Sequence, residues 1–312
     1  MQKIMSSDWA VIINPKSGKK KFRQQRKYLF LTLKHAGIRF ESKVTKFAGH
    51  AAKIAKLFAE QHYQNFMVLG GDGTLHEVIN GIFSANIAHT HPLKIALIPR
   101  GTGNDWGRFW GLTRDYKHSI DIFLKGNTRL IDIGKVMYSV EGEAQTCFFI
   151  NSIGFGLDAL VAKITNKLKQ YIGSHSFIYT FAKLLSVFSY RASTVIIESE
   201  KGSLERKMIA VKVANGSYSG GGMQLTPHAL PYDGLLDVMI ARKPGFLDVM
   251  SALPRLFNGK LLEHRIIESF QTTNLNVTCH TNVLMEADGI IINGESPYTI
   301  SIIRDAIKMV IP

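Results

Sequence analysis

The sequence has few cysteines, no long apolar run and a shortage of acidic residues. Its two cysteines, Cys147 and Cys279, lie far apart in 312 residues, which excludes a disulfide framework and favours the reducing cytoplasm. No stretch reaches the roughly 18 consecutive apolar residues of a membrane span. The first eight residues also lack the apolar run of a signal peptide. We therefore expect a cytoplasmic protein whose contact with a membrane is peripheral.

Acidic residues are outnumbered, because 38 Lys and Arg face 24 Asp and Glu and give a formal net charge of +14. This charge favours an anionic partner: nucleic acid, a membrane surface or a phosphorylated ligand. The chain has no recognised DNA-binding motif, and its aromatic residues are not interleaved with Lys and Arg as in RNA-binding signatures. We therefore expect no nucleic-acid partner. The 46% of apolar residues can fill a sizeable core, and the length suggests about two domains.

Residues 1–132 alternate short apolar runs with amphipathic segments. The runs 10–13, 39–44, 66–69 and 94–98 predict strands, and the segments 22–35, 50–61 and 75–83 predict helices. This alternation predicts an α/β domain with a parallel sheet covered by helices. Ligands of such sheets bind at the loops beyond the carboxyl ends of the strands.

Residues 133–312 have a different texture. Strand-like runs at 135–138, 146–152, 194–198, 207–214, 236–241 and 274–278 are separated by turn-rich pieces, which predicts a mostly antiparallel β domain. The last strands, 298–303 and 307–311, are able to close either domain. A helical region from Leu157 to Tyr190 carries lysines beside an apolar face, so it either packs on the β domain or meets a membrane.

Three loops rich in small residues follow three of the predicted parallel strands. Gly70-Gly71-Asp72-Gly73-Thr74 lies between a strand and a helix, where glycines allow a close approach and the helix N-terminus offers N–H groups to phosphate. Asp72 suits such a place if Mg²⁺ bridges it to phosphates; the alternative is a plain turn in which Asp72 caps the helix. The segments 14–18 and 99–105 occupy the same edge, where Arg100 is able to supply charge. Together they predict a nucleotide site.

The motifs Asn-Pro-x-Ser-Gly, Gly-Gly-Asp-Gly-Thr and Pro-x-Gly-Thr-x-Asn-Asp, in this order, resemble the diacylglycerol kinase catalytic domain, which bacterial lipid kinases share with sphingosine and ceramide kinases. Gly221-Gly222, the segment Asp233 to Val238 and Asp288-Gly289 extend the resemblance to nearly the whole chain. It implies a nucleotide-binding α/β domain, residues 1–132, followed by a β-sandwich lipid domain, residues 133–312, whose last strand returns to the first domain. ATP and lipid would meet in the cleft between them.

The resemblance also implies site residues. The implied ATP contacts are Asn14, Pro15, Lys16, Ser17, Gly18, Thr45, Gly71, Asp72, Gly73, Thr74, Leu75, His76, Glu77 and Thr102. Asp72 would belong to a Mg²⁺-linked network, and a second Mg²⁺ position would involve Leu230, Asp233 and Leu235.

One departure from the family pattern concerns the catalytic base. The family's Asp-Gly-Glu supplies a glutamate for the lipid hydroxyl, but here Ile290 follows Asp288-Gly289, and isoleucine cannot accept a proton. Asp288 and Glu295 are the candidates to replace it. We expect an ATP- and Mg²⁺-dependent kinase acting on a membrane lipid such as diacylglycerol, with catalytic residues Asp72, Asp288 and Glu295. The alternatives are a catalytically weak nucleotide-binding membrane module and a NAD kinase. The oligomeric state stays open, a homodimer included.

A further motif, Gly154-Phe155-Gly156-Leu157-Asp158-Ala159, fits a dinucleotide fingerprint but lies in the β-rich half. We interpret it as a tight turn into the helical region.

Overall fold

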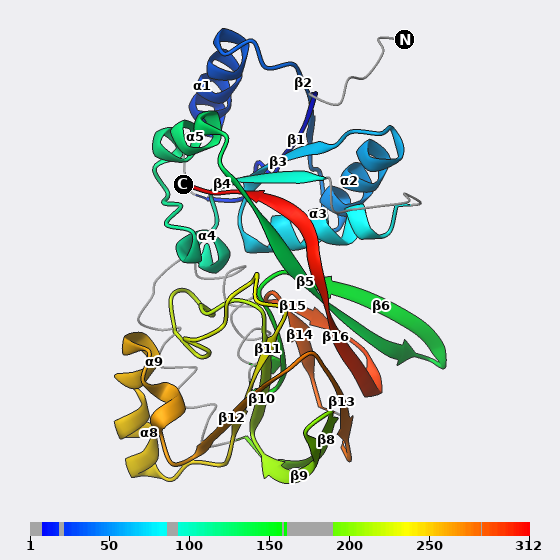
Figure 1. The fold of residues 1–312 in the computed structure, drawn as a ribbon, viewed down its shortest axis with the longest axis vertical. Helices are drawn as coiled ribbons and strands as arrows, with labels where there is room; N and C mark the ends of the chain where they lie inside the picture. The colour runs from blue at the N-terminus through cyan, green and yellow to red at the C-terminus, as the bar shows by residue number, and fades with distance from the viewer. Residues whose placement is uncertain (1–7, 19–21, 86–92, 158, 161–189, 282) are drawn as a thin grey trace. The chain divides into compact units, whose positions relative to one another are not determined.

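The computed structural model describes residues 8–18, 22–85, 93–157, 159–160, 190–281 and 283–312. The chain divides into two compact units (Figure 1): the first is Met1–Ile133 with Arg304–Pro312, and the second is Gly134–Ile303. Among the described residues, no helix combines the length and the apolar character that crossing a bilayer requires. The predicted helical region from Leu157 to Tyr190 lies almost entirely outside the described residues.

The first unit is the predicted parallel α/β fold, in which strands and helices alternate. Its strands follow the order β2-β1-β3-β4-β16, and each of these neighbouring pairs is parallel. Its elements are β1 (Trp9–Ile13), α1 (Phe22–His35), β2 (Phe40–Val44), α2 (His50–Glu60), β3 (Asn65–Gly70), α3 (Asp72–Phe83), β4 (Lys94–Pro99), α4 (Asp105–Phe109), α5 (Tyr116–Lys125) and the end of β16 (Glu295–Val310).

The strand order has a switch point between β1 and β3. The chain leaves β1 toward β2 on one side, and β3 and β4 follow on the other side. Because right-handed crossovers in opposite directions put their helices on opposite faces, α1 covers one face while α2 and α3 cover the other. The two loops that diverge at such a point leave a crevice beyond the carboxyl ends of the strands. The loops after Ile13 and Gly70 are therefore the ones that the topology favours for a ligand.

The second unit is antiparallel and has two sheets. One sheet has the strand order β12-β11-β10-β7-β14-β15; in the other, β16, β13, β8 and β9 pair in turn and β5 pairs with β6. The elements are β5 (Thr128–Val140), β6 (Glu143–Phe149), β7 (Ser152–Gly156), β8 (Ser193–Ser199), β9 (Gly202–Met208), β10 (Ala210–Ala214), β11 (Leu236–Ala241), α8 (Phe246–Ala252), α9 (Arg255–Asn258), the 3-10 turn η1 (Leu261–Glu263), β12 (Ile267–Thr272), β13 (Asn274–Cys279), β14 (Met285–Ala287) and β15 (Ile290–Ile292).

Alternate residues of both sheets fill one core in the second unit. Phe155, Val213 and Met285 from one sheet pack with Val277 and Tyr298 from the other, all of them buried. This alternation is what a sheet needs when only one of its faces is turned to the core.

Several predicted elements of the second half differ from the structure. The run 207–214 is two strands, β9 and β10, and the two C-terminal runs are one strand, β16. Gly154 to Gly156 lie within β7 and the helical residue Leu157 follows directly, so within the motif interpreted as a tight turn into the helical region the change of direction falls at Gly156, which has a φ of +82°. Gly154 pairs with Lys212 on one side and with Glu286 on the other, which gives this glycine a place in a sheet.

Gly81 allows α3 to approach α2. A Cβ on Gly81 would lie 2.2 Å from the Ala52 carbonyl oxygen and 2.8 Å from the Ala55 Cβ. We expect Gly81→Ala to lower the free energy of unfolding by about 1–3 kcal/mol, because overpacking outweighs the gain in helix propensity. Gly73, in the first turn of the same helix, has open space around its Cβ position. Urea denaturation of Gly73→Ala should show unchanged or slightly higher stability; equal effects at both sites would contradict this account.

Candidate functional site

Loops from adjacent strands of the first unit begin at one level. Ile13 pairs with Val44 on one side and with Leu69 on the other, and Leu69 pairs with Ile98. The loops that start at Asn14, Thr45, Gly71 and Arg100 therefore leave the same edge of the sheet. This brings together the three segments whose composition predicted a nucleotide site, together with Thr45.

The loop after β1 is held by Asn14. The Asn14 side chain donates to Thr74 Oγ1 at 2.9 Å and accepts from the backbone N–H of Lys16 at 2.9 Å, while Ser17 Oγ donates to the Asn14 carbonyl at 2.8 Å. Pro15 fits the fixed turn that these bonds enclose. One side chain thus fixes the loop internally and joins it to α3.

Arg100 joins the loop after β4 to the loop after β1. Its Nε and Nη2 donate to the Ser17 carbonyl oxygen at 3.1 and 3.0 Å, and its guanidinium lies over the ring of Phe22. Arg100 is buried, and burial lowers the pKa of the guanidinium. Its remaining nitrogen, Nη1, is buried without a hydrogen-bond partner among the described residues. The charge of Arg100 is therefore anchored directly behind the loop.

Glycines are required where these loops touch. A Cβ on Gly71 would lie 2.6 Å from the Gly101 Cα, and a Cβ on Gly18 would lie 2.6 Å from the Arg100 carbonyl oxygen. Gly18 also has a φ of +78°, which residues with a side chain rarely adopt. The loops consequently pack backbone against backbone.

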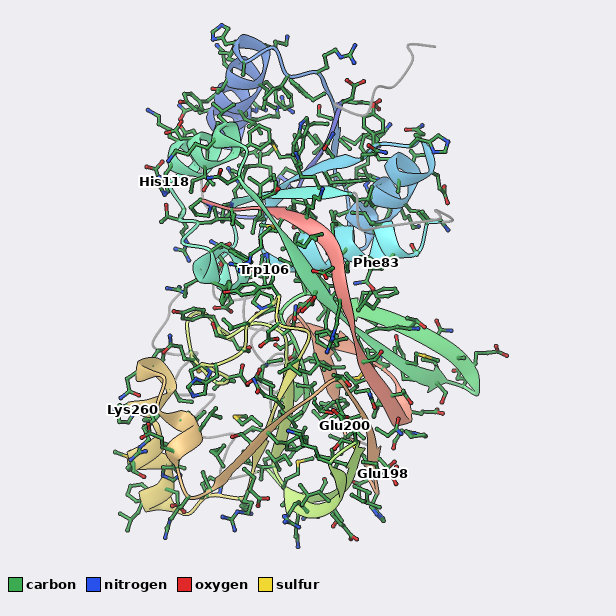
Figure 2. All side chains as sticks on the ribbon, viewed as in Figure 1. Phe83, Trp106, His118, Glu198, Glu200 and Lys260 are labelled. Atoms are coloured by element: carbon green, nitrogen blue, oxygen red, sulfur yellow. The ribbon has the colours of Figure 1, made fainter. Side chains whose placement is uncertain are left out.

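Asp72 caps a helix. The alternative to metal binding was that it caps the helix that follows it, α3, but in the structure it caps α4. It is the first residue of α3, and its carboxylate accepts from the backbone N–H groups of Asp105 (3.2 Å) and Trp106 (3.3 Å) at the start of α4. Trp106 is labelled on α4 in Figure 2. The positive end of the α4 dipole therefore faces this carboxylate.

Two further predicted residues on α3 have local partners. The carboxylate of Glu77 accepts from the backbone N–H groups of Gly49 (2.8 Å) and Ala51 (3.0 Å), so it caps the start of α2. His76 is buried, and the Asn80 amide lies 3.3 Å from its Nε2. Glu77 thereby ties α3 to the loop after Thr45.

The remaining predicted contacts differ in their exposure. Leu75 is fully buried in the core and Thr102 is exposed in the loop after β4. Thr45 is buried, and its N–H donates to the Ile13 carbonyl at 2.8 Å. Asn104, which the prediction did not include, has a φ of +51° and a buried Oδ1 without a hydrogen-bond partner among the described residues. Its position in the motif Gly-Thr-Gly-Asn-Asp was the only signal for it.

The predicted metal residues of the second unit form one turn. The Asp233 N–H donates to the Leu230 carbonyl at 3.4 Å, and the Leu235 N–H donates to Asp233 Oδ1 at 2.9 Å. Next to this turn, burial raises the pKa of the Asp237 carboxyl, and the Gln271 amide opposes that shift. Carbonyl and carboxylate oxygens are the ligands that Mg²⁺ prefers, so the chemistry of the turn fits such an ion. Within the described part of the chain, no cluster of three or more His, Cys, Asp or Glu is suited to a metal.

Asp288 holds the segment that joins β6 to β7. Its carboxylate accepts three backbone N–H groups, from Ile150 (3.0 Å), Asn151 (2.9 Å) and Ser152 (3.0 Å). From the other side, the Asn215 amide donates to the Ile150 carbonyl at 2.8 Å. Three segments far apart in the sequence thus meet around Asp288.

Glu286, which the prediction passed over, supports the same turn. Its Oε2 accepts from the Gly289 N–H at 2.6 Å, and its Oε1 lies 3.3 Å from Lys212 Nζ. Both side chains of this ion pair are at most 5% exposed. They face each other across Gly154, which has no side chain to separate them. The sequence signal that could have revealed the pair was Lys212 itself, a lysine between apolar residues in a strand.

Ile290 and Glu295 begin the two strands that follow Asp288, β15 and β16. Ile290 pairs with Ala287 and is half-buried, whereas Glu295 opens β16 with an exposed side chain. Among the described residues, none donates a hydrogen bond to the Glu295 carboxylate. The two candidate carboxylates therefore differ. Backbone N–H groups donate to both oxygens of Asp288, whereas the side chain of Glu295 is exposed to solvent.

Two family models match the chain. Residues 8–136 match the model described as "Diacylglycerol kinase catalytic domain", and residues 151–311 match "YegS C-terminal NAD kinase beta sandwich-like domain". The chain belongs to the diacylglycerol kinase catalytic-domain family. It is thus an enzyme, a kinase of the lipid-kinase class, as the motifs predicted.

The alignments with two similar proteins extend over most of this lipid kinase. It is 25% identical over 280 residues to the diacylglycerol kinase of Staphylococcus carnosus (strain TM300), covering 89% of this chain and 87% of that one. It is 27% identical over 281 residues to the diacylglycerol kinase of Bacillus subtilis (strain 168), covering 89% and 88%.

Solved structures confirm the predicted fold class. A crystal structure of a diacylglycerol kinase from Bacillus anthracis str. Sterne has a TM-score of 0.75 at 20% identity, covering 98% of this chain and 97% of that one. Yeast NADH kinase complexed with NADH has a TM-score of 0.57 at 12% identity, covering 98% and 83%. At these identities the likeness shows the shared fold alone.

Arg100 offers a test of the loop architecture. Arg100→Lys keeps the charge but cannot direct two N–H groups at the Ser17 carbonyl. We expect a loss of about 1–3 kcal/mol in the free energy of unfolding, because a buried hydrogen-bonding group is left poorly paired. Arg23→Lys, at an exposed position of α1, should change stability by less than about 0.5 kcal/mol. Urea denaturation measures both, and equal small effects would show that the Ser17 contact is dispensable.

Proposed function

We propose that this lipid kinase transfers the γ-phosphoryl group of ATP to a hydroxyl of a membrane lipid such as diacylglycerol, with Mg²⁺ required. The observation that carries the proposal is the set of Gly-rich loops at the switch point of a parallel sheet, where α/β folds bind nucleotides. The similar proteins named diacylglycerol kinase support the choice of acceptor. The product would be a phosphorylated lipid of the kind that phospholipid biosynthesis consumes.

The first unit supplies the ATP site in this proposal. Gly73 leaves open space at the N-terminus of α3, where backbone N–H groups favour phosphate. The buried, unsatisfied Oδ1 of Asn104 and Nη1 of Arg100 lie in the loop after β4, as expected where a ligand completes the hydrogen bonding. The residues assigned to ATP are Asn14 to Gly18, Thr45, Gly71 to Glu77 and Thr102. Leu75, Glu77 and His76 would act by shaping α3, given their burial and their local partners.

The residues assigned to metal are Asp72 and the turn Leu230, Asp233 and Leu235. Bound Mg²⁺ would neutralise charge on the β- and γ-phosphates. Asp72, held by two N–H groups of α4, presents a carboxylate whose orientation is fixed before any ligand arrives. Such pre-orientation is what phosphoryl transfer requires of a protein, because positioning and charge neutralisation account for most of the catalysis.

The acceptor hydroxyl needs a group that can take its proton. Three N–H donors stabilise the Asp288 carboxylate and occupy its oxygens, so Asp288 serves here as a positioning residue for Ile150 to Ser152. Glu295 is accessible and remains the candidate general base in place of the glutamate that Ile290 replaces. The second unit would thus bind the lipid and complete catalysis, in contact with the membrane surface that holds the substrate.

Loss of the Asp72 charge should abolish turnover. Asp72→Asn keeps one of the two oxygens that cap α4, so we expect a folded protein with a slightly lowered melting temperature but a fall of at least about 100-fold in lipid phosphorylation, a typical cost of removing a preorganised charged group. Asp115→Asn is the matched control, because Asp115 caps α5 by accepting from the Lys117 N–H. Radioactive ATP with extracted lipids, resolved by thin-layer chromatography, measures the product. Full activity of Asp72→Asn would overturn the scheme.

The same assay separates the rival functions. Label on lipid supports the lipid kinase, label on added NAD supports a NAD kinase, and ATP binding without any product supports a catalytically weak module. Only the first outcome agrees with the proposal.

The assignment of the base can be tested independently. Glu295→Gln should lower kcat about 100-fold with little change in KM, which is the usual loss when a general base is removed. Adding Ile290→Glu to that variant should restore part of kcat, because it returns a carboxylate to the position that the family uses. Glu143→Gln, an exposed carboxylate on β6, is the control and should keep full activity. An unchanged kcat in Glu295→Gln would exclude Glu295 as the base.

A further inference from the structure

Four large apolar side chains are exposed on two consecutive short helices of the second unit. Phe246, Leu247 and Met250 on α8 are 68%, 77% and 52% exposed, and Phe257 on α9 is 60% exposed. Of the described large apolar residues, these are four of the five most exposed, and they fall within 12 positions of the chain. We call these four residues the α8–α9 apolar patch.

The buried side of α8 combines the apolar Val249 with the charged Asp248, and its bulkiest apolar residues lie on the exposed side. Asp248 is buried, where it accepts from the Gly245 N–H at 2.9 Å and pairs with Arg265 at 2.7 Å. Hydrogen bonding to Arg265 lowers the pKa of the Asp248 carboxyl. Ser251 Oγ lies 2.8 Å from Nε2 of the buried His264. This polar network fixes the helix so that its bulky apolar residues face outward, against the usual hydrophobic bias.

Positive charge predominates in the segment that carries the patch. Residues 242–265 contain five Lys and Arg against two Asp and Glu, a formal net charge of +3, although Arg242 also pairs with Glu268 at 3.8 Å. Lys243 and Lys260 are exposed and form no ion pair with any described residue. Lys260 is labelled beside the two helices in Figure 2. Exposed bulky apolar side chains in a segment with two unpaired lysines suit the headgroup–acyl boundary of an anionic bilayer.

We propose that the α8–α9 apolar patch is a membrane-docking surface that inserts into anionic lipid bilayers. A bilayer fits better than a second copy of the chain, because a twofold interface would place two segments with a net positive charge against each other. The proposal stands apart from the kinase assignment, since vesicle binding is measured without nucleotide or turnover.

The apolar part is tested by vesicle sedimentation of the full chain with phosphatidylcholine vesicles containing phosphatidylglycerol. The double variant F246Q/L247Q should bind at least about tenfold more weakly, given the transfer free energy of one large apolar side chain. The control L57Q/L124Q alters two exposed leucines on α2 and α5 and should bind as the parent does. F246L/L247F keeps the apolar character and should retain binding, which separates lost insertion from a disturbed fold.

The charged part is tested with the same vesicles. K243Q/K260Q should weaken binding about fivefold per lysine, in accordance with the attraction of one basic residue to an anionic surface. The effect should shrink at high salt and vanish on pure phosphatidylcholine. K125Q/K201Q, at two exposed lysines elsewhere, is the control. Undiminished binding of F246Q/L247Q, or equal losses in the control variants, would overturn the proposal and place the membrane contact on another part of the chain.

Discussion

The candidate site of the first unit depends on a close approach of two backbones, at Gly71 and Gly101. A single Cβ at either position would lie within 3 Å of the other loop, so the two loops can be this close only because both residues are glycine. Their approach places the Asp72 carboxylate at the N-terminus of α4. A Cβ on Gly103 would come within 3.2 Å of that carboxylate, so a third glycine keeps the space around it open. Contacts between and within the loops therefore require Gly71, Gly101 and Gly103 before any ligand is considered, whereas Gly73 has open space.

The features that could be predicted from the sequence are those that depend on residues close together in the chain. Strand–helix alternation predicted the parallel sheet, and short loops after consecutive parallel strands must meet at one edge, so the grouping of Asn14, Gly71 and Arg100 followed. The partner of Asp72 could not be predicted in this way. Its carboxylate bonds N–H groups 33 and 34 residues away, and α4 has only five residues, too few for a periodic pattern.

Gly154 in β7 has a role that the sequence pattern did not predict. Gly154 in a strand would ordinarily suggest a turn or a bulge. Here it separates Lys212 from Glu286 on neighbouring strands and lets their side chains form a buried ion pair. A buried pair is costly to desolvate and contributes little net stability, but removal of either partner would leave an uncompensated charge. The pair therefore fixes the register of β10, β7 and β14, and through Gly289 it fixes the turn that carries Asp288.

The large positive charge is not all available to partners. Arg100 is buried and bonded to the loop after β1, Lys212 is neutralised by Glu286, and Arg265 is paired with Asp248. What remains around the α8–α9 apolar patch is exposed and acts over a distance of about one Debye length, roughly 8–10 Å. Apolar insertion acts only on contact. Under the proposed docking, charge would therefore govern how fast the second unit reaches an anionic surface, and the apolar side chains how long it stays, which suits the lipid acceptor that we propose.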